Sequence, residues 1–232
     1  MKKSWKTNLK ILWNGWGCSI FVALIIATSF KSAIADWNIV PTGSMKPTII
    51  EGDRIFVNKL AYDLKIPYTT LHIAEWGDPQ RGDIVVFFSP ADGKRLVKRV
   101  VGVPGDSIAM RNNQLVINGE KIEYEPINDL KINNPSLSID ANQYGFIEKL
   151  RDTPHPVMFT PVRPSLRSFG LITIAEGEYF MMGDNRDNSG DSRYFGFVER
   201  NRIIGQATSI VISLDINNSY QPRWNRFFTD LP

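Results

Sequence analysis

Cysteine and histidine are scarce in this chain, and their scarcity excludes several kinds of site. The 232 residues include one cysteine, Cys18, and two histidines, His72 and His155. One cysteine cannot form an intrachain disulfide. A metal site built on several thiolates or imidazoles would need more of these ligands than the chain contains. We therefore expect no metal centre.

The scarcity of histidine also argues against a catalytic triad of serine, histidine and aspartate, which would have to use one of the two. His155 lies between Pro154 and Pro156, and His72 stands in Leu-His-Ile with no recognisable signature around it. We interpret both histidines as surface or packing residues, so a reactive serine in this chain would need a different base.

The chain has little excess charge outside its first ten residues. The net charge is +3, and Lys2, Lys3, Lys6 and Lys10 supply four positive charges with no acid among them. The 23 remaining basic residues nearly balance the 24 acidic ones. A basic surface is therefore not predicted, and we expect no nucleic-acid partner.

A long uncharged run follows the basic residues at positions 11–30. As a helix rising about 1.5 Å per residue it would span roughly 30 Å, the thickness of the hydrocarbon core of a bilayer. We predict a cytoplasmic basic segment at 1–10 and a transmembrane anchor at 11–35, with the remainder translocated. A cleaved secretory signal is the alternative, because Ala33-Ile34-Ala35 precedes Asp36 as an Ala-x-Ala site.

No long amphipathic helical pattern follows residue 36, whereas short apolar runs bounded by turn residues recur. The pattern predicts a mainly β fold, in which the expected strands are residues 84–88, 96–103, 115–117 before an Asn-Gly turn, and 203–214.

The predicted β domain is interrupted. Residues 36–123 and 171–232 carry the strand pattern, while residues 124–170 are rich in proline, asparagine and serine. We expect this middle segment to be an inserted cap subdomain or an irregular surface insertion.

Ser44 follows a glycine in the sequence Pro-Thr-Gly-Ser-Met-Lys-Pro-Thr at residues 41–48. A glycine beside a reactive serine lets the backbone approach a substrate closely. The same residue types also form ordinary linker turns, so this motif alone leaves both interpretations open.

Lys98 is the candidate base for such a serine. It alternates with Leu96 and Val100 in an apolar strand, so its side chain should share their face. On an inward face, desolvation lowers the pKa of the amine, and a neutral lysine can accept the proton of Ser44. Arg99 stays protonated and cannot serve. A solvent-facing strand lysine is the alternative.

Residues 183–193 form a third polar motif, Gly-Asp-Asn-Arg-Asp-Asn-Ser-Gly-Asp-Ser-Arg. Its alternating acidic and amide residues resemble a calcium loop, but an EF-hand loop ends in a glutamate and has flanking helices. We interpret the motif as a buried polar scaffold that positions other residues.

Together these motifs resemble the type I signal peptidases (leader peptidases), Ser/Lys proteases that remove signal peptides from exported proteins. Residues 41–48 resemble the family's serine box except that Thr42 replaces a serine. Residues 81–87, 98–106 and 183–193 resemble its other boxes, in the same order. The resemblance runs from the anchor to about residue 210, and several boxes in order are a highly specific signal.

The resemblance implies a role for each matching residue. Ser44 would attack the scissile carbonyl and Lys98 would take its proton. The oxyanion hole would consist of the Ser44 backbone N–H and the hydroxyl of Thr42, whose extra methyl restricts its rotamer.

Other residues would support this pair by the same resemblance. Ser189 would hydrogen-bond and orient Lys98, while Asp191 and Arg193 would form a supporting ion pair. Shallow apolar pockets selecting alanine at substrate positions −1 and −3 would be lined by Val40, Met45, Ile49 and Val97.

The resemblance thus implies a membrane-bound serine endopeptidase that cleaves after Ala-x-Ala sites in secreted preproteins, without a metal or organic cofactor. It would lie in the bacterial cytoplasmic membrane with its catalytic domain on the periplasmic or outer face, and the lipid bilayer would be its second partner. Trp224, Phe227 and Phe228 would add interfacial contact or pack in the core. A processing protease dedicated to a conjugation or secretion system, and an anchored binding domain that has lost catalysis, are the alternatives.

Overall fold

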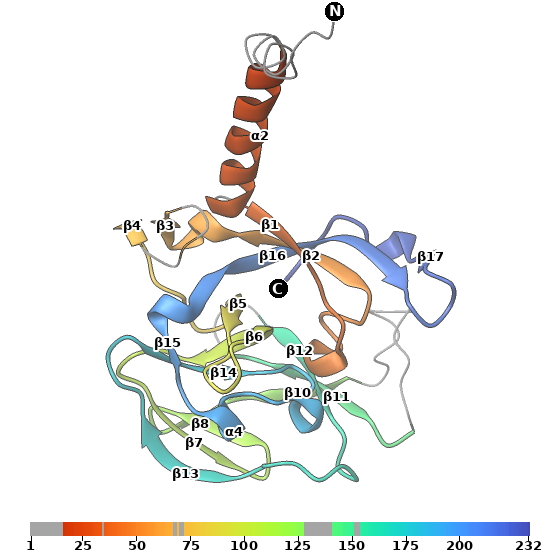
Figure 1. The fold of residues 1–232 in the computed structure, drawn as a ribbon. Coiled ribbons are helices and arrows are strands. Elements are labelled where there is room, and N and C mark those ends of the chain that lie inside the picture. Colours follow the sequence, from red (N-terminus) through yellow and green to blue (C-terminus); the bar gives the residue numbers. More distant parts are fainter. Residues whose placement is uncertain (1–15, 34, 67–68, 70–71, 128–140, 151–153) are drawn as a thin grey trace, which may run out of the picture.

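The computed structural model describes residues 16–33, 35–66, 69, 72–127, 141–150 and 154–232. Helix α2 (Trp16–Ala33) projects from one end of a body built almost entirely of strands (Figure 1). The prediction of a mainly β fold is confirmed.

The predicted anchor at 11–35 is only partly covered by the structure, because residues 11–15 and 34 lie outside the described residues. Within the described residues, no helix combines the length and apolarity that crossing a membrane requires.

A nine-stranded antiparallel sheet forms the centre of the body, in the order β1-β2-β16-β5-β6-β14-β15, with β17 and β18 paired to the long strand β16. Its strands are β1 (Ala35–Ile39), β2 (Asp53–Asn58), β5 (Ile84–Phe88), β6 (Arg95–Gly102), β14 (Glu178–Met182), β15 (Val198–Glu199), β16 (Ile203–Asp215), β17 (Gln221–Pro222) and β18 (Thr229–Asp230).

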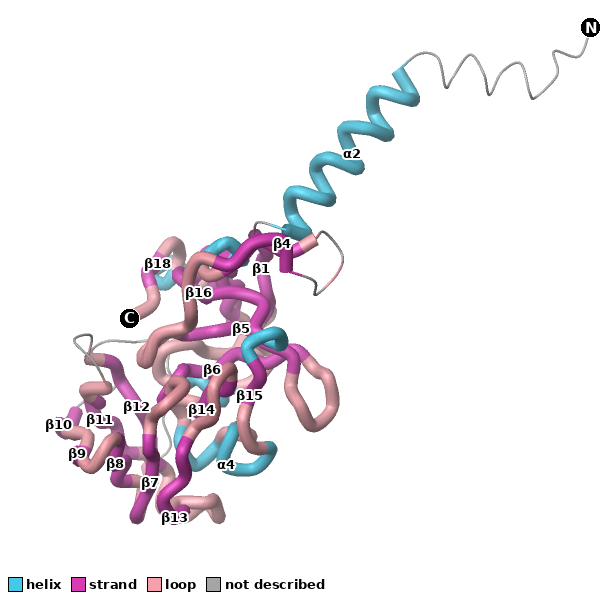
Figure 2. The backbone as a smooth tube through the Cα atoms, turned by 90° about the vertical axis from the view of Figure 1, so that its left-hand side faces the viewer, coloured by secondary structure: helices cyan, strands magenta, loops and turns pink. Residues whose placement is uncertain are grey.

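Three smaller sheets complete the fold. A four-stranded sheet of order β13-β7-β8-β9 lies at the end of the molecule away from α2, as Figures 1 and 2 both show. A two-stranded sheet consists of β3 and β4, and a three-stranded one has the order β10-β11-β12. Their bounds are β3 (Asp63–Lys65), β4 (His72–Glu75), β7 (Ser107–Arg111), β8 (Gln114–Ile117), β9 (Glu120–Lys121), β10 (Tyr124–Ile127), β11 (Tyr144–Glu148), β12 (His155–Phe159) and β13 (Phe169–Thr173).

Short helical turns connect the strands. These elements are η1 (Gly43–Met45), η2 (Lys59–Ala61), η3 (Arg186–Asn188), α4 (Ser192–Phe195), η4 (Arg200–Arg202) and η5 (Trp224–Arg226). The sequence motifs contain η1, η3 and the start of α4.

The described part of the predicted insertion at 124–170 contains the β10–β12 sheet. The rings of Tyr124, Phe146 and Phe159 pack against one another with centroids 5.3–6.5 Å apart, which gives this sheet a small aromatic core. The predicted boundary after residue 170 falls inside β13, which pairs with β7 of the body.

The strand predictions for residues 84–88 and 96–103 agree with β5 and β6 to within one residue at each end. Strand β5 lies between β16 and β6, so both of its edges are hydrogen-bonded within the sheet. Ile84 and Val86 pack in one apolar cluster, whereas Val85 and Phe87 pack in another. A strand covered on both faces is therefore continuously apolar in sequence.

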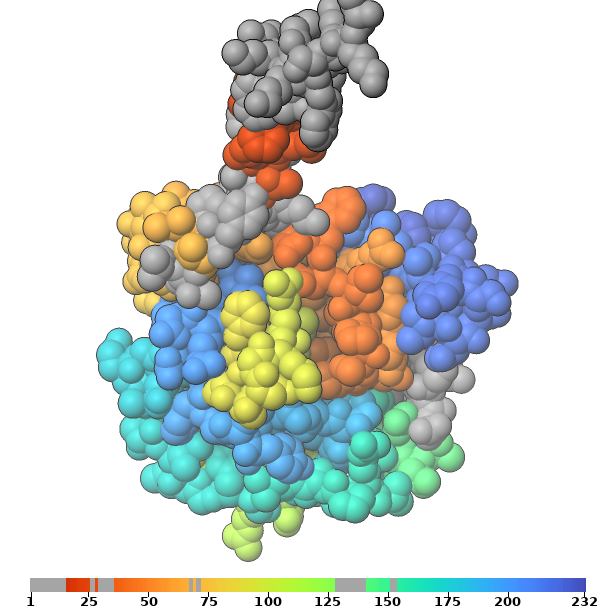
Figure 3. Space-filling model, viewed as in Figure 1, coloured from red at the N-terminus to blue at the C-terminus, as the bar shows by residue number. Residues whose placement is uncertain are grey.

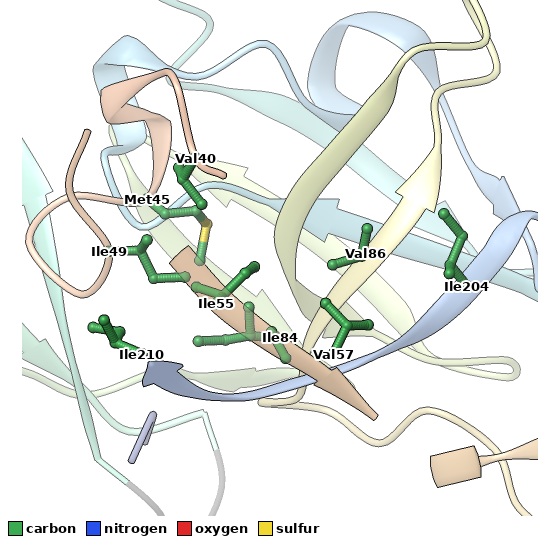
Figure 4. Close-up of a cluster of buried hydrophobic side chains, with 10 residues drawn as sticks. Val40, Met45, Ile49, Ile55, Val57, Ile84, Val86, Ile204 and Ile210 are labelled. Atoms are coloured by element: carbon green, nitrogen blue, oxygen red, sulfur yellow. The ribbon is translucent and has the colours of Figure 1, made fainter. Parts of the chain in front are cut away.

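The first of these clusters anchors the segment that carries Ser44. Figure 4 shows Val40, Met45 and Ile49 from that segment packed beside Ile55 of β2 and Ile84 of β5. Burying such side chains contributes about 1.5–3 kcal/mol each, so the chain around Ser44 is fixed to the central sheet.

Candidate active site

Ser44 is the middle residue of the turn η1. Its neighbours Gly43 and Met45 are buried, while Ser44 itself is only partly buried. A side chain at position 43 would place its Cβ 2.5 Å from Glu51 Oε1, so the end of the Glu51 side chain would have to move to accommodate it. The turn therefore presents its serine away from the core.

Lys98 meets this serine from β6. Its Nζ lies 2.6 Å from Ser44 Oγ and also donates to Val97 O at 3.0 Å. The residue is 2% exposed. Leu96 and Val100 pack in one cluster with Val85, the cross-strand partner of Lys98, so the expected inward face is confirmed.

Burial sets the charge of the lysine amine. Desolvation lowers the pKa of Lys98 from 10.5 to about 8, and it outweighs the opposing pull of the carboxylates of Asp191 and Asp184. Arg193 adds a smaller effect in the lowering direction. About a tenth of the molecules would thus carry a neutral amine at pH 7, so the arrangement can supply a base near neutral pH.

The motif at 183–193 is a buried scaffold, as its polarity predicted. Asp191 and Arg193 form the expected ion pair, with 2.8 Å between Oδ2 and Nη2 and both side chains fully buried. Asp191 also accepts from the backbone N–H of Gly183, and Arg193 donates to the carbonyl of Arg186. The ion pair thus closes the segment into a loop.

Ser189 departs from expectation, because it makes no hydrogen bond to Lys98. Its Oγ is buried and has no hydrogen-bond partner among the described residues. The reason is packing: this oxygen fills the space beside Gly183 that a Cβ would occupy, next to the main chain of Ser44. Lys98 directs its hydrogens to Ser44 and Val97 instead.

Thr42 immediately precedes the turn in an extended conformation with φ −127° and ψ 151°. It is exposed, and its side chain does not cap η1. Its hydroxyl is therefore not engaged in capping the turn that carries Ser44.

The residues expected to line substrate pockets divide into two groups. Val40, Met45 and Ile49 belong to the apolar core, and the last two have no exposed surface. Val97 is only partly buried against the same cluster. The side chains of Met45 and Ile49 pack in the core, and a shallow apolar pocket lined by these four residues stays a prediction.

Sequence reasoning missed Asn185. Its side-chain amide donates to Gly43 O at 2.9 Å, and its backbone N–H donates to Ser44 O at 3.1 Å. One residue therefore holds two consecutive carbonyls of the serine turn. Its place inside the 183–193 motif was the available signal.

Arg99 cannot act as a base, but its side chain helps to connect the three motifs. Its guanidinium contacts both carboxylate oxygens of Asp184 at 2.9 Å, and Thr48 donates to the same carboxylate at 2.5 Å. A buried arginine requires such a partner. A paired carboxylate was therefore predictable, although its identity was not.

The two histidines lie in other environments. His155 Nε2 is 3.1 Å from Glu148 Oε2, in the β10–β12 sheet, and His72 Nδ1 lies 3.2 Å from Asp63 and from Glu75. In the part of the chain that the structure describes, no three acidic, histidine or cysteine residues are grouped to hold a metal.

Comparisons with known proteins show which proteins this chain is similar to. Residues 13–212 match the family model described as signal peptidase, peptidase S26. The signal peptidase I of Pseudomonas fluorescens is 36% identical, covering 90% of this chain and 75% of that protein. The signal peptidase I of Pseudomonas aeruginosa is 35% identical, covering 95% of this chain and 80% of that protein. A crystal structure of a signal peptidase I from Enterococcus faecalis, 33% identical, covers 56% of this chain and 97% of its own, with a TM-score of 0.35.

The buried amine predicts a stability effect that is separate from activity. Between pH 8 and 10.5 the unfolded chain binds more protons at Lys98 than the folded protein, so wild-type stability rises with pH there. The lowered pKa of Lys98 corresponds to a cost of about 3 kcal/mol in the free energy of folding. Replacing the amine also removes its hydrogen bonds to Ser44 and Val97, each of which contributes about 1 kcal/mol. We expect Lys98→Met to raise the free energy of unfolding by about 1–2 kcal/mol at pH 7, with the gain shrinking as pH rises. Urea titrations at pH 7 and pH 10 measure it.

The matched control is Lys94→Met, whose side chain is exposed beside Asp92. It should show no gain in stability at pH 7. The claim that burial of the Lys98 amine destabilises the folded protein would be contradicted in two cases. Either Lys98→Met is no more stable than wild type at pH 7, or its gain in stability does not depend on pH.

Proposed function

The chain belongs to the signal peptidase family, peptidase S26, and is an enzyme of the signal peptidase I class; from this we propose that it removes signal peptides from exported preproteins with Ser44 as nucleophile and Lys98 as general base. The observation that carries the proposal is the 2.6 Å contact between Lys98 Nζ and Ser44 Oγ, made by an amine that is almost fully buried.

The proposed reaction follows from this contact. Neutral Lys98 takes the Ser44 proton as Oγ attacks the scissile carbonyl. The Ser44 N–H and the Thr42 hydroxyl stabilise the resulting oxyanion. The ammonium of Lys98 then donates its proton to the leaving amine, which releases the mature protein. Lys98 finally activates a water that hydrolyses the acyl-enzyme.

The Asp191–Arg193 pair has a supporting role in this proposal. It ties Arg193 to the carbonyl of Arg186 and Asp191 to the N–H of Gly183. These contacts fix the segment that covers Lys98. The carboxylate of Asp191 also keeps the pKa of Lys98 from falling further.

The proposed preference for Ala-x-Ala sites follows from the packing beneath Ser44. Val40, Met45 and Ile49 form a buried apolar floor, while Val97 is partly exposed at its edge. A floor already packed to the density of a core leaves no depth for a large side chain. Alanine at positions −1 and −3 is therefore the residue that fits.

We further propose that residues 11–35 anchor the enzyme in the bacterial cytoplasmic membrane, with the body on the periplasmic or outer face. Strand β1 begins just after α2 and exposes Trp37 and Ile39 by 58% and 61%. Trp224 and Phe228 are 73% and 78% exposed, so core packing is wrong for them. Large exposed apolar residues of this kind suit a lipid surface.

This position brings the site close to its substrate. The chain from β1 through the Ser44 turn lies beside the β5–β6 hairpin on one face, coloured orange and yellow in Figure 3. Arg95 of the hairpin donates a hydrogen bond to Asn38 of β1 at 2.6 Å and so connects the two. An enzyme and a signal peptide held in one membrane meet at a raised effective concentration.

The first test of the function is cleavage of a preprotein by purified enzyme in detergent. Ser44→Ala and Lys98→Ala should each abolish cleavage, because one removes the nucleophile and the other its base. His72→Ala is the control and should cleave like wild type. In the wild type, kcat/KM should rise with pH through a midpoint near 8, since only the neutral amine accepts a proton. Full activity in Lys98→Ala would refute the mechanism.

Thr42 is tested by removing its hydroxyl while keeping its shape. Thr42→Val should lower kcat by about 10²-fold, with KM little changed, because an oxyanion donor acts mainly in the transition state. Thr42→Ser keeps the donor and should retain most of the activity. Equal rates for the valine and serine variants would remove Thr42 from the oxyanion hole.

The proposed specificity is tested on the substrate. Replacing alanine by leucine at position −1 should lower kcat/KM by about 10–100-fold, because an overpacked site costs about 1–3 kcal/mol. The control places leucine at −2, since alternate side chains of an extended peptide point away from the surface. Equal cleavage of both substrates would show that the packed floor does not select small residues.

A further inference from the structure

The inserted β10–β12 sheet joins the 183–193 segment through four buried or partly buried side chains. Glu148, at the end of β11, accepts from the guanidinium of Arg186 and from the hydroxyl of Tyr124, the latter at 2.5 Å. His155 stands opposite Glu148 across the β11–β12 pair, with Nε2 3.1 Å from Oε2. Glu148 is therefore the centre of a cluster formed by two parts of the fold.

The charged groups of this cluster stabilise one another's ionised states. Burial opposes ionisation of Glu148, but Arg186 and His155 outweigh it and hold its pKa below the usual range. Burial likewise opposes the charge of Arg186, and Glu148 outweighs it so that the pKa of Arg186 is raised. Glu148 and Arg186 thus form a charged pair with side chains at most 1% exposed. Removing one partner would leave the other charge buried and unpaired.

Main-chain contacts carry this attachment to the serine. The N–H of Met158, on β12, donates to Asp184 O at 2.8 Å, and Met158 forms an isolated parallel bridge with Asn185. Asn185, the residue before Arg186, holds Gly43 and Ser44 by the two hydrogen bonds described above. The inserted sheet therefore contacts Asn185, the residue that clamps the serine turn, directly.

A second path leads to the lysine. The carbonyl of Arg186 accepts from Arg193, which pairs with Asp191. Asp191 holds Gly183 and acts electrostatically on Lys98. Moving the backbone at Arg186 would therefore disturb both members of the Ser44–Lys98 pair.

We propose that Glu148 is a positioning residue for cleavage: by fixing Arg186, the inserted sheet sets the geometry of Ser44 and Lys98. The inserted sheet is then a working part of the active site. This inference rests on the proposed function, because it assigns Glu148 an effect on the two residues that perform the reaction.

The experiment measures kcat, KM and the pH profile of preprotein cleavage in the full chain carrying Glu148→Gln. We expect kcat to fall by about tenfold or more, since a displacement of about 1 Å can cost on the order of 10²-fold. KM should stay within about twofold, because the substrate-facing residues are unchanged. The midpoint near pH 8 should also shift, which a purely structural role would not produce.

Asp63→Asn is the matched control. Asp63 is likewise a buried carboxylate paired with an arginine, Arg200, at 2.9 Å, but it lies in the β3–β4 sheet. This variant should lose stability while keeping the wild-type kcat and pH midpoint at a temperature well below its unfolding transition.

Tyr124→Phe serves where Glu148→Gln does not fold. It removes the hydroxyl between Glu148 and Arg186 without leaving a charge unpaired, and kcat should fall about threefold or more. Wild-type kcat and pH midpoint in a folded Glu148→Gln variant, or in Tyr124→Phe, would overturn the inference. Failure of the proposed function would look different, because Ser44→Ala would then cleave like wild type.

Discussion

The desolvation of one lysine amine is the constraint on which the rest of the structure depends. In water an ammonium such as that of Lys98 stays charged up to about pH 10.4 and cannot act as a base near neutrality. Its position in the middle of β6, between apolar neighbours that face a common cluster, removes the water that stabilises the charge. The carboxylates of Asp191 and Asp184 pull the pKa upward. The result is a balance, in which the amine loses much of its preference for charge but remains hydrogen-bonded.

That balance requires a rigid surrounding, and the three polar motifs provide it together. Thr48 from the serine motif, Arg99 beside the lysine, and Asp184 from the third motif meet in one buried cluster. Within this cluster each of the three polar side chains is hydrogen-bonded to another. Asn185 adds two bonds to the serine turn itself. Residues separated by more than a hundred positions in sequence are thereby held to within a hydrogen bond of each other.

The sequence predicted the parts of this arrangement that depend on local pattern. Apolar runs identified β5, β6 and β16, because strand periodicity and burial are visible in a few residues. Alternation with Leu96 and Val100 also predicted that Lys98 shares their face, while a solvent-facing lysine remained the alternative. The features that the sequence could not show depend on where each side chain points in the folded protein. The burial of Met45 and the clamp by Asn185 both arise from long-range contacts. The proline-rich middle segment also concealed a sheet, because its strands are short and interrupted.

The position of the lysine explains why such an amine can be accommodated at all. Its burial costs about 3 kcal/mol, which is a large part of the roughly 5–15 kcal/mol that stabilises a typical domain. Strand β6 lies between β5 and β14, and the face of Lys98 is shared by buried apolar residues from all three strands, including Val85, Val100 and Met181. Burial of each contributes about 1.5–3 kcal/mol, which offsets the cost of desolvating the amine. At a sheet edge the amine would retain its water and its ordinary pKa. A reactive lysine of this kind therefore belongs on an interior strand.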